Sequence, residues 1–513
     1  MLKFFRIFVS LFIFVYLSVF FLDFTETIPL SAHMLAHVQI VPLIQAKMIP
    51  PLLVLIVLTL LFGRFYCSML CPFGILQDIV ARIAKICRRK KAKYQFQPEM
   101  SKTRWGFLLL FIVGLVAMPV IVSLLDPYSL YGRFMALVAR PIYRTCNNNL
   151  AGFNSDWFSY TTVHVFWIPA AIAFFMTLLV TVLAFFFGRR YCNTICPVGT
   201  LLGLFAKISP YRVRFNSRCG SCGLCERTCK GECLDSKTKT VDVSRCVDCF
   251  NCLAVCRKQG ISFGKQNDVP VPVLNHTDST ATVPRRTFLQ SITALLLLGS
   301  TARADVQLNA DGLPTGQSRI PYKKTHPVLP PGANSKRHLT HHCTACQLCV
   351  AKCPSNVLQP SITDLGIRGF LMPVAKFDHG FCAYNCTICT QVCPTRALIT
   401  LSEDEKHKLQ IGRVVFLEDN CVVLTQDVNC GACAEHCPTG AVTMRPYGPP
   451  DSALTLPEID ADLCVGCGAC ENICPVSPYR AIYVDGLEKH GEAKPAFDPN
   501  EKQQEVLLDS FGF

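Results

Sequence analysis

The sequence lacks the short motifs that attach two common kinds of redox cofactor. It contains no Cys-x2-Cys-His segment for covalent haem and no Gly-x-Gly-x-x-Gly fingerprint for a dinucleotide. Charge is also scarce, because charged residues make up only 17% of the 513 positions. Residues 23–43 contain no Lys or Arg at all. These absences leave no motif for a c-type haem or a nicotinamide cofactor, and they indicate a chain with long uncharged stretches.

The chain is instead rich in apolar residues and in cysteines. Half of its residues are hydrophobic and its mean hydropathy is +0.32, which favours a membrane protein, and its length suggests roughly three domains. The net charge is +14, but the basic residues stand beside apolar runs, so membrane topology explains them and no nucleic-acid partner is expected. The 31 cysteines are tightly clustered, which is typical of metal ligands and not of a disulfide framework.

Four apolar runs are long enough to cross the roughly 20-residue hydrocarbon span, and they predict a four-helix membrane domain over residues 1–215. The runs cover about 4–22, 44–63, 106–125 and 163–187. Seven basic residues lie between Arg82 and Lys93, in the loop after the second run. By the positive-inside rule this loop is cytoplasmic, and Lys3 and Arg6 place the N-terminus on the same side.

The predicted membrane domain contains an internal repeat. The segment FGRFYCSMLCPFGIL after the second run returns as FGRRYCNTICPVGTL after the fourth, at a constant offset of 125 positions. Each copy carries Cys-x3-Cys-Pro, with Cys67 and Cys71 in the first and Cys192 and Cys196 in the second. A pseudo-two-fold arrangement would bring the four thiols together at the cytoplasmic membrane edge. They are candidates for a shared iron-sulfur cluster or a redox-active thiol site, and the alternative is that they only pack two helix ends.

Two cysteine quartets follow the membrane domain and predict a cytoplasmic two-cluster ferredoxin domain over residues 216–262. Each quartet has the spacing Cys-x2-Cys-x2-Cys-x3-Cys, in which three thiolates hold one [4Fe-4S] cluster and the fourth reaches the neighbouring cluster. The pairing is therefore crossed. Structural zinc is the alternative, but zinc ligands usually fall into two distant pairs. The expected sets are Cys219, Cys222, Cys225 with Cys256, and Cys246, Cys249, Cys252 with Cys229.

Four further quartets predict an extracytoplasmic four-cluster domain over residues 338–513. They are Cys343, Cys346, Cys349, Cys353; Cys382, Cys386, Cys389, Cys393; Cys421, Cys430, Cys433, Cys437; and Cys464, Cys467, Cys470, Cys474. The spacing leaves open which motif pairs with which. So many clusters leave few side chains for an apolar core, so metal must supply much of the folding energy. The total is six [4Fe-4S] clusters, and Cys87, Cys146 and Cys233 are expected to be structural.

A segment that resembles an export signal stands in the middle of the chain. Arg285 and Arg286 precede a short apolar core over residues 288–298 and a small-residue site at Ala302-Arg303-Ala304. Polar, Pro-rich linkers are predicted on both sides, over residues 263–284 and 305–337. The segment 285–304 therefore resembles a twin-arginine signal, and a plain fifth anchor is the alternative. Both interpretations carry the last domain across the membrane.

These motifs together resemble a known family of membrane polyferredoxins. Two Cys-x3-Cys-Pro repeats followed by two ferredoxin motifs are similar to NapH-type quinol dehydrogenase subunits, and a twin-arginine-like segment followed by four motifs is similar to NapG-type partners. NosR-type proteins share the first half. The resemblance implies a NapH/NapG-type fusion in the inner membrane. It would oxidise quinol from the membrane quinone pool and relay electrons to a periplasmic reductase, as in nitrate respiration, or to a cytochrome.

The expected fold is an α-helical membrane protein with four transmembrane helices, a fifth signal or anchor segment, and α+β bacterial-ferredoxin-like domains. The alternative function is a NosR-like maturation or regulatory donor that keeps a partner metalloenzyme reduced, and a static scaffold is a further alternative. No motif fixes the quinol site. His33, His37, Asp126 and His164 lie near the predicted outer membrane ends and are candidates for exchanging quinol protons, although each is more often an ordinary interfacial residue.

Overall fold

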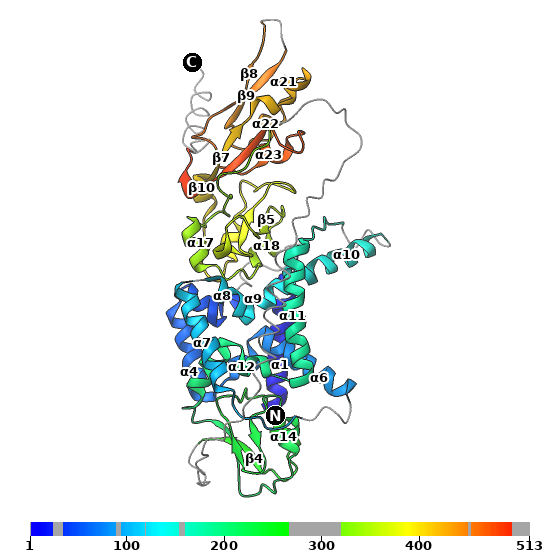
Figure 1. Cartoon of the computed structure of the whole chain (residues 1–513), viewed down its shortest axis with the longest axis vertical. Helices are drawn as coiled ribbons and strands as arrows, with labels where there is room; N and C mark the ends of the chain where they lie inside the picture. The colour runs from blue at the N-terminus through cyan, green and yellow to red at the C-terminus, as the bar shows by residue number, and fades with distance from the viewer. Residues whose placement is uncertain are drawn as a thin grey trace, which may run out of the picture. The chain divides into compact units, whose positions relative to one another are not determined.

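The structure is a computed structural model, which describes residues 2–23, 34–88, 94–117, 119–152, 160–265, 320–449 and 453–494 (Figure 1). Residues 2–206 are largely helical, and short helices with small sheets follow. Three expectations fall partly or wholly outside the described residues. They are His33, the twin-arginine-like segment 285–304, and parts of both linkers that flank it.

Two of the four expected membrane spans are continuous helices. α1 (Leu2–Leu22) and α11 (Trp167–Phe187) have 21 residues each and are the two helices of the described chain that are long and apolar enough to cross a membrane. The second run forms α3 (Ile40–Gln45) and α4 (Ile49–Phe62), and the third forms α7 (Ser101–Val116) and α8 (Pro119–Leu125). Prolines begin α8 and occupy the first turn of α4, because proline is tolerated in a first turn but breaks a helix interior.

The two sequence repeats have the same local structure. α4 ends at Gly63 and α11 at Gly188, and both glycines have positive φ angles, of 79° and 66°. A one-turn helix follows in each copy, α5 (Phe65–Met69) and α12 (Arg190–Thr194). The Cys-Pro pair then begins a longer helix, α6 (Pro72–Cys87) or α13 (Pro197–Ala206). In each repeat the chain therefore turns at the end of a long helix, passes through a one-turn helix and enters a second long helix.

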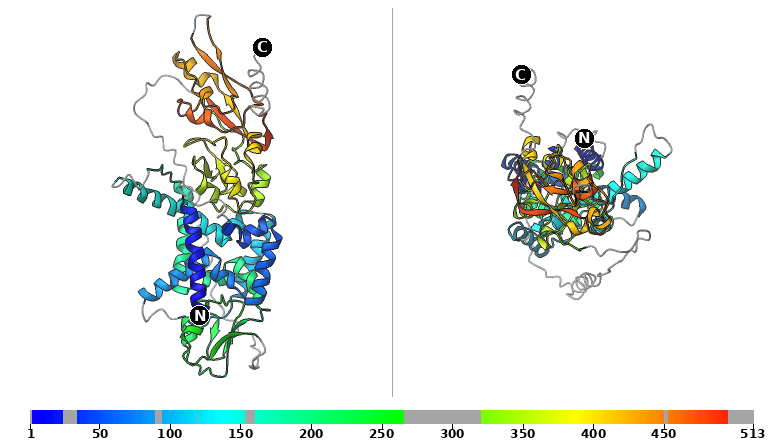
Figure 2. Two further views of the ribbon diagram at one scale, coloured as in Figure 1. Left: turned by 180° about the vertical axis from the view of Figure 1, so that it is seen from behind. Right: turned by 90° about the horizontal axis from the view of Figure 1, so that it is seen from above.

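Between the two repeats the chain makes a second set of helices. After α7 and α8, it continues through α9 (Pro127–Phe134), the π-helical turn η3 (Met135–Ala139) and α10 (Arg140–Ala151), while the short helix α2 (Met34–His37) lies before the first repeat. Asp126 is the N-cap of α9, and its carboxylate accepts hydrogen bonds from the backbone of Tyr128 and Ser129. α9 packs against α6, α8 and α11. Figures 1 and 2 show α10 extending sideways from the other helices.

The first two cysteine quartets lie in a small α+β unit, called here the first ferredoxin part (residues 212–264). Strand β1 (Arg212–Phe215) pairs antiparallel with β4 (Ile261–Gly264), with Val213 opposite Phe263. The short hairpin of β2 (Leu234–Asp235) and β3 (Thr240–Val241) lies between two one-turn helices, α14 (Leu224–Thr228) and α15 (Asn251–Val255). Each of these helices carries the third cysteine of a quartet, so the fold places the two quartets close together.

The other four quartets lie in the last ferredoxin part (residues 336–492), which repeats this construction twice. Its first half holds α17 (Lys336–His342), α18 (Leu348–Lys352), η4 (Ile367–Gly369), α19 (Ile388–Gln391), α20 (Glu403–His407) and the hairpin of β5 (Leu358–Pro360) with β6 (Pro373–Ala375). The second half holds η5 (Glu418–Asn420), α21 (Val422–Gln426), α22 (Ala432–Glu435), α23 (Ala469–Ile473) and two antiparallel pairs. These are β7 (Leu409–Phe416) with β10 (Ile482–Glu492), and β8 (Val442–Pro446) with β9 (Thr455–Ile459).

Candidate metal centres

The first ferredoxin part brings its cysteines together in the crossed pattern. Burial raises the pKa of the Cys252 thiol, and the neighbouring sulfurs of Cys249, Cys246 and Cys229 raise it further. Cys229 thus joins the other quartet. In the first quartet, burial raises the pKa of Cys225 to about 11, with Cys219 and Cys222 as neighbours. The glycine that accompanies Cys256, Gly260, packs against Cys219 and donates its N–H to the Cys256 sulfur.

The last ferredoxin part resolves a choice that the spacing left open. Burial raises the pKa of Cys349, and Cys343, Cys346 and Cys393 raise it further, so the first motif here takes the fourth cysteine of the second. Cys389 is surrounded in the same way by Cys382, Cys353 and Cys386.

The third and fourth motifs of this part exchange in the same manner. Burial raises the pKa of Cys470, and the neighbouring sulfurs are Cys467, Cys464 and Cys437. Cys421 has Cys430 and Cys474 beside it. Adjacent motifs therefore pair, first with second and third with fourth.

The cysteine sets fit [4Fe-4S] clusters. Each set gathers three thiols from one motif and a fourth from the neighbouring motif. A cubane takes each thiolate at a separate corner iron, and three thiolates on one short segment with a fourth from the next motif suit it. Structural zinc usually takes its ligands from two distant pairs.

One cysteine that the sequence analysis assigned to a structural role stands inside a quartet. The Cys233 sulfur lies 3.5 Å from the Cys229 sulfur, and both are buried. Cys246 also interacts with Cys233. The sequence offered a signal for this, because Cys233 follows Cys229 by four positions, but the spacing lies outside the quartet pattern. The other two, Cys87 and Cys146, are exposed.

The four repeat cysteines form one buried group, called here the four-thiol site. Cys67, Cys71, Cys192 and Cys196 are each at most 5% exposed. Burial raises the pKa of Cys71, and the neighbouring Cys192 and Cys67 sulfurs raise it further. Cys196 likewise has all three of the others as neighbours. The expected meeting of the two repeats is therefore present in the structure.

Two arginines that the sequence analysis did not select cross between the repeats. Arg64 and Arg189 occupy equivalent repeat positions, and both are completely buried. Arg64 donates to the Cys192 carbonyl at 3.1 Å and lies 3.8 Å from the Cys67 sulfur. Arg189 donates to the Cys67 carbonyl at 2.6 Å. Each arginine therefore holds the first cysteine of the opposite copy and brings positive charge to the thiols.

Asp78 on α6 connects this site to the first ferredoxin part. Its carboxylate accepts from Arg189 at 2.8 Å, pairs with Arg6 of α1 and lies 3.5 Å from the Lys230 ammonium. Burial alone would raise the pKa of Asp78, but Arg189, Lys230 and Arg6 together hold it well below its usual range. Lys230 directly follows Cys229. One carboxylate therefore joins α1, both repeats and a cluster motif.

The two ferredoxin parts are linked to opposite ends of α1 by ion pairs. In the first part Lys230 pairs with Asp78 of α6, which in turn pairs with Arg6 near the start of α1. The last part reaches its other end through a buried ion pair of 2.8 Å between Lys352 and Asp23. The Lys352 ammonium also stands 4.5 Å from the centre of the Phe20 ring. A 21-residue helix is about 31 Å long, so the two contacts are separated by roughly that length.

The described quinol-site candidates have separate surroundings. Asp126 caps α9 and also accepts from the Ser129 hydroxyl at 2.6 Å. The ring of His164 stacks on His379 of the last ferredoxin part, with 4.2 Å between ring centres. His37 is half-buried in α2. The structure gives Asp126 a clear helix-capping role.

The hairpins, the one-turn helices and the crossed quartets define the class of the protein as a ferredoxin-type iron-sulfur protein. A sequence profile described as "4Fe-4S binding domain" matches residues 48–93 and 168–216, which hold the four-thiol site. Two profiles described as "4Fe-4S dicluster domain" match residues 242–357 and 428–500. The [4Fe-4S] ferredoxin domains expected from the sequence are therefore confirmed.

Three relatives illustrate the likeness. The ferredoxin-type protein NapF of Escherichia coli K12 is 32% identical over 173 residues, which cover 34% of this chain and 93% of NapF. The ferredoxin-type protein NapG of Haemophilus influenzae is 29% identical over 37% of this chain and 67% of its own length. The methylamine utilization ferredoxin-type protein MauM of Methylobacillus flagellatus is 30% identical over 29% of this chain and 64% of its own length. No solved structure matches the chain.

The chain belongs to the ferredoxin-type iron-sulfur electron-transfer family that includes NapF. The resemblance drawn from the sequence is confirmed at this level. The NapH/NapG-type fusion, the likeness to NosR-type proteins and the number of membrane spans stay predictions.

Proposed function

We propose that the protein oxidises quinol from the membrane quinone pool and passes the electrons to an extracytoplasmic reductase or cytochrome. The observation that carries this proposal is the placement of cysteines. The first ferredoxin part is linked to the start of α1 through Lys230 and Asp78, the last part is linked to its other end through Lys352 and Asp23, and four buried thiols lie among the helices. A [4Fe-4S] cluster, when bound, accepts and releases one electron at a time.

We assign the 24 quartet cysteines as ligands of six clusters. The sets in the first ferredoxin part are Cys219, Cys222, Cys225, Cys256 and Cys246, Cys249, Cys252, Cys229. Those in the last part are Cys343, Cys346, Cys349, Cys393; Cys382, Cys386, Cys389, Cys353; Cys421, Cys430, Cys433, Cys474; and Cys464, Cys467, Cys470, Cys437. The sulfur neighbourhoods support this crossed assignment.

The four-thiol site is proposed as a redox centre between the two ferredoxin parts. Tyr191, next to Cys192, is buried, and its hydroxyl donates to the Leu125 carbonyl at 3.4 Å. Three residues further along the chain, Tyr128 is buried too, and the sulfurs of Cys346 and Cys393 contribute to its raised pKa after burial itself. Two buried tyrosines therefore lie between the repeat thiols and the last ferredoxin part, and we propose that electrons pass through this region.

The topology that suits this function has four membrane crossings and a periplasmic last domain. Support comes from the two 21-residue apolar helices and from the ion pairs that link the ferredoxin parts to opposite ends of α1. The basic residues near Arg82 favour the cytoplasm for the first part. Export of the last domain rests on the twin-arginine-like segment 285–304. Reporter fusions that place both ferredoxin parts on one side would contradict this topology.

Anaerobic iron and sulfide analysis tests the cluster assignment. Six quartets at four irons each predict about 24 irons per chain, with up to about four more if the four-thiol site holds a cluster of the same type. Eight irons or fewer would overturn the relay. A protein that carries the expected iron but shows no steady quinol turnover would support the maturation role instead.

A double variant tests the four-thiol site separately. Cys67→Ser with Cys192→Ser should leave the iron of the six quartets in place and slow quinol-driven reduction of the clusters many-fold. The matched control is Cys87→Ser with Cys146→Ser, because both of these cysteines are exposed and lie outside every set. If the Cys67/Cys192 variant is stably produced and its clusters are reduced at the control rate, these thiols have only a packing role.

A further inference from the structure

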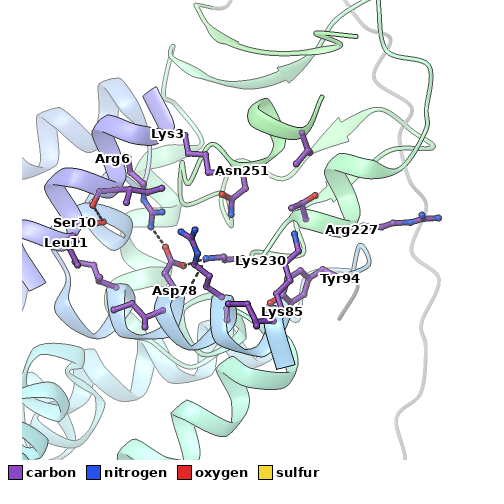
Figure 3. A pocket seen from close by; sticks show the side chains of 18 residues that line it. Lys3, Arg6, Ser10, Leu11, Asp78, Lys85, Tyr94, Arg227, Lys230 and Asn251 are labelled. Atoms are coloured by element: carbon purple, nitrogen blue, oxygen red, sulfur yellow. Dashed lines mark hydrogen bonds and ion pairs between the residues drawn. The ribbon is translucent and has the colours of Figure 1, made fainter. Parts of the chain in front are cut away.

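A cavity of about 610 Å³ lies where the start of α1, the α6 helix and the first ferredoxin part meet (Figure 3). One wall is apolar and is formed by side chains such as Ile7, Leu11 and Ile79. Leu11 is 53% exposed, so this wall continues onto the apolar outer surface of α1. The cavity is therefore open to a ligand with an apolar tail that arrives from the bilayer.

The opposite wall is polar and strongly basic. Six cations line the cavity against the single carboxylate of Asp78. Figure 3 shows Arg6 and Lys230 directed at Asp78, with Lys3, Asn251 and Tyr94 around them. Arg82 and Lys85 are exposed and connect the cavity with water on the basic side of the helices. A headgroup in the cavity would therefore meet fixed positive charge and hydrogen-bonding groups.

The floor of the cavity lies between two cysteine groups. Asp78 holds Arg189, which in turn binds the Cys67 carbonyl of the four-thiol site. On the other side, Lys230 adjoins Cys229 and Asn251 adjoins Cys252, both from the second quartet. A bound redox carrier would thus stand between two candidate electron acceptors, connected to one through Asp78 and Arg189 and to the other through Lys230 and Asn251.

We propose that this cavity binds the headgroup of the membrane quinol, with its tail along α1 and α6. The inference rests on the proposed function and gives that function a site at the basic membrane edge, not at the outer ends where His37, Asp126 and His164 lie. The positive field favours the deprotonated form of the quinol, which is the form that loses an electron most easily.

The proposed quinol oxidation is balanced in electrons and protons. The quinol loses two protons and two electrons and becomes the quinone. The electrons go singly to two oxidised iron-sulfur or thiol-bound centres, one on each side of the cavity. The protons go to water at the mouth near Lys85. Asp78 already holds three cations, so it accepts a hydrogen bond from the headgroup and keeps no proton.

Photolabelling of the full chain in phosphatidylcholine proteoliposomes tests the site. An azidoquinone should label the α6 peptide, residues 72–87, and excess natural quinone should suppress the labelling. Ile79→Trp fills the cavity from a half-buried position and should reduce labelling at least tenfold with cluster iron unchanged. Leu109→Trp is the matched control, because Leu109 lies on α7, is 64% exposed and does not line the cavity.

The other outcomes separate this inference from the proposed function. Labelling that concentrates near His164 and ignores Ile79→Trp would overturn the cavity assignment and leave quinol oxidation standing. No quinone labelling anywhere would overturn both. The cavity would instead be an anionic-lipid site if added cardiolipin abolished labelling of α6 while cluster reduction by quinol continued at its usual rate.

Discussion

Two glycines set how closely the one-turn helix of each repeat packs against the helix that follows it, and their replacement gives the sharpest test of the four-thiol geometry. Gly74 and Gly199 are the third residues of α6 and α13. A Cβ added to Gly74 would lie against the Cys67 carbonyl, and one added to Gly199 against the Cys192 carbonyl, both well inside the 3.0 Å limit of real Cβ contacts. The obstacle in each case is backbone, so no side chain can rotate away.

The size of the effect follows from two opposing contributions. Overpacking of this kind costs about 3 kcal/mol, at the upper end of the usual range, because the backbone must move. Alanine in a helix recovers about 1 kcal/mol relative to glycine. Gly74→Ala and Gly199→Ala should therefore each destabilise the protein by about 2 kcal/mol. Gly106→Ala on α7 is the matched control, since nothing lies within 4 Å of its added Cβ, and it should stabilise by about 1 kcal/mol.

Thermal unfolding of the purified full chain, followed by circular dichroism under anaerobic conditions, measures the difference. About 3 kcal/mol between test and control corresponds to roughly 6–12 °C in Tm for a unit of this size. The test variants should also lose quinol-driven reduction, because the displaced peptide carries the first cysteine of its motif. If Gly74→Ala and Gly199→Ala melt within 2 °C of Gly106→Ala, the close approach of each glycine to the carbonyl of the first cysteine in its own repeat is refuted.

Three further predictions concern the ferredoxin parts. His490 is buried without a hydrogen-bond partner in the described chain, and burial lowers its pKa to about 4 from 6.5. As pH falls from 6.5 to 4 the unfolded chain therefore binds a proton that the folded chain does not. The free energy of unfolding of the wild type should then fall more steeply than that of His490→Phe, by up to about 3 kcal/mol; parallel pH profiles would contradict this. Asp23→Asn leaves Lys352 buried without its partner charge and should cost about 3–5 kcal/mol in chemical unfolding, whereas Asp23→Leu with Lys352→Met should restore most of it; equal losses in both would show that the pair is not coupled. Cys229→Ser should keep more cluster iron than Cys252→Ser, because Cys233 lies 3.5 Å from Cys229 and can replace it; equal iron loss would give Cys233 a packing role.

The repeats and the quartets are where the sequence was most informative. A constant offset of 125 positions between the two FGR copies indicates equivalent structures, and the copies do share their glycine, one-turn helix and Cys-Pro start. The crossed contact of Cys229 with the other quartet follows from a three-residue spacing that places the fourth cysteine beyond a short helix. Such local spacings predict well because the few residues between ligands leave the chain little conformational choice.

What the sequence could not supply depends on contacts between distant segments. The role of Arg64 as a clamp on the opposite repeat needs residues 128 positions apart to meet. Asp78 has no motif around it in the sequence, yet it holds cations from α1, from the residue that precedes α12 and from the first ferredoxin part. Motif pairing in the last part was open for the same reason. The second and third apolar runs are interrupted helices, and hydropathy did not show this because it averages over the prolines at Pro50 and Pro119.

Charge explains why the repeats carry arginine so close to their thiols. Four thiolates that bind a cationic iron-sulfur core remain negative together, and a buried negative group needs a counter-charge that water cannot provide. Arg64 and Arg189 supply that charge from inside the site, and each is fixed by a cysteine carbonyl of the opposite copy. Asp78 then balances Arg189 and extends the network to Arg6 and Lys230. The same chain of alternating charges ends at the cavity, so a change in the charge of the four-thiol site is transmitted by direct ion pairs to the place where we expect the quinol headgroup.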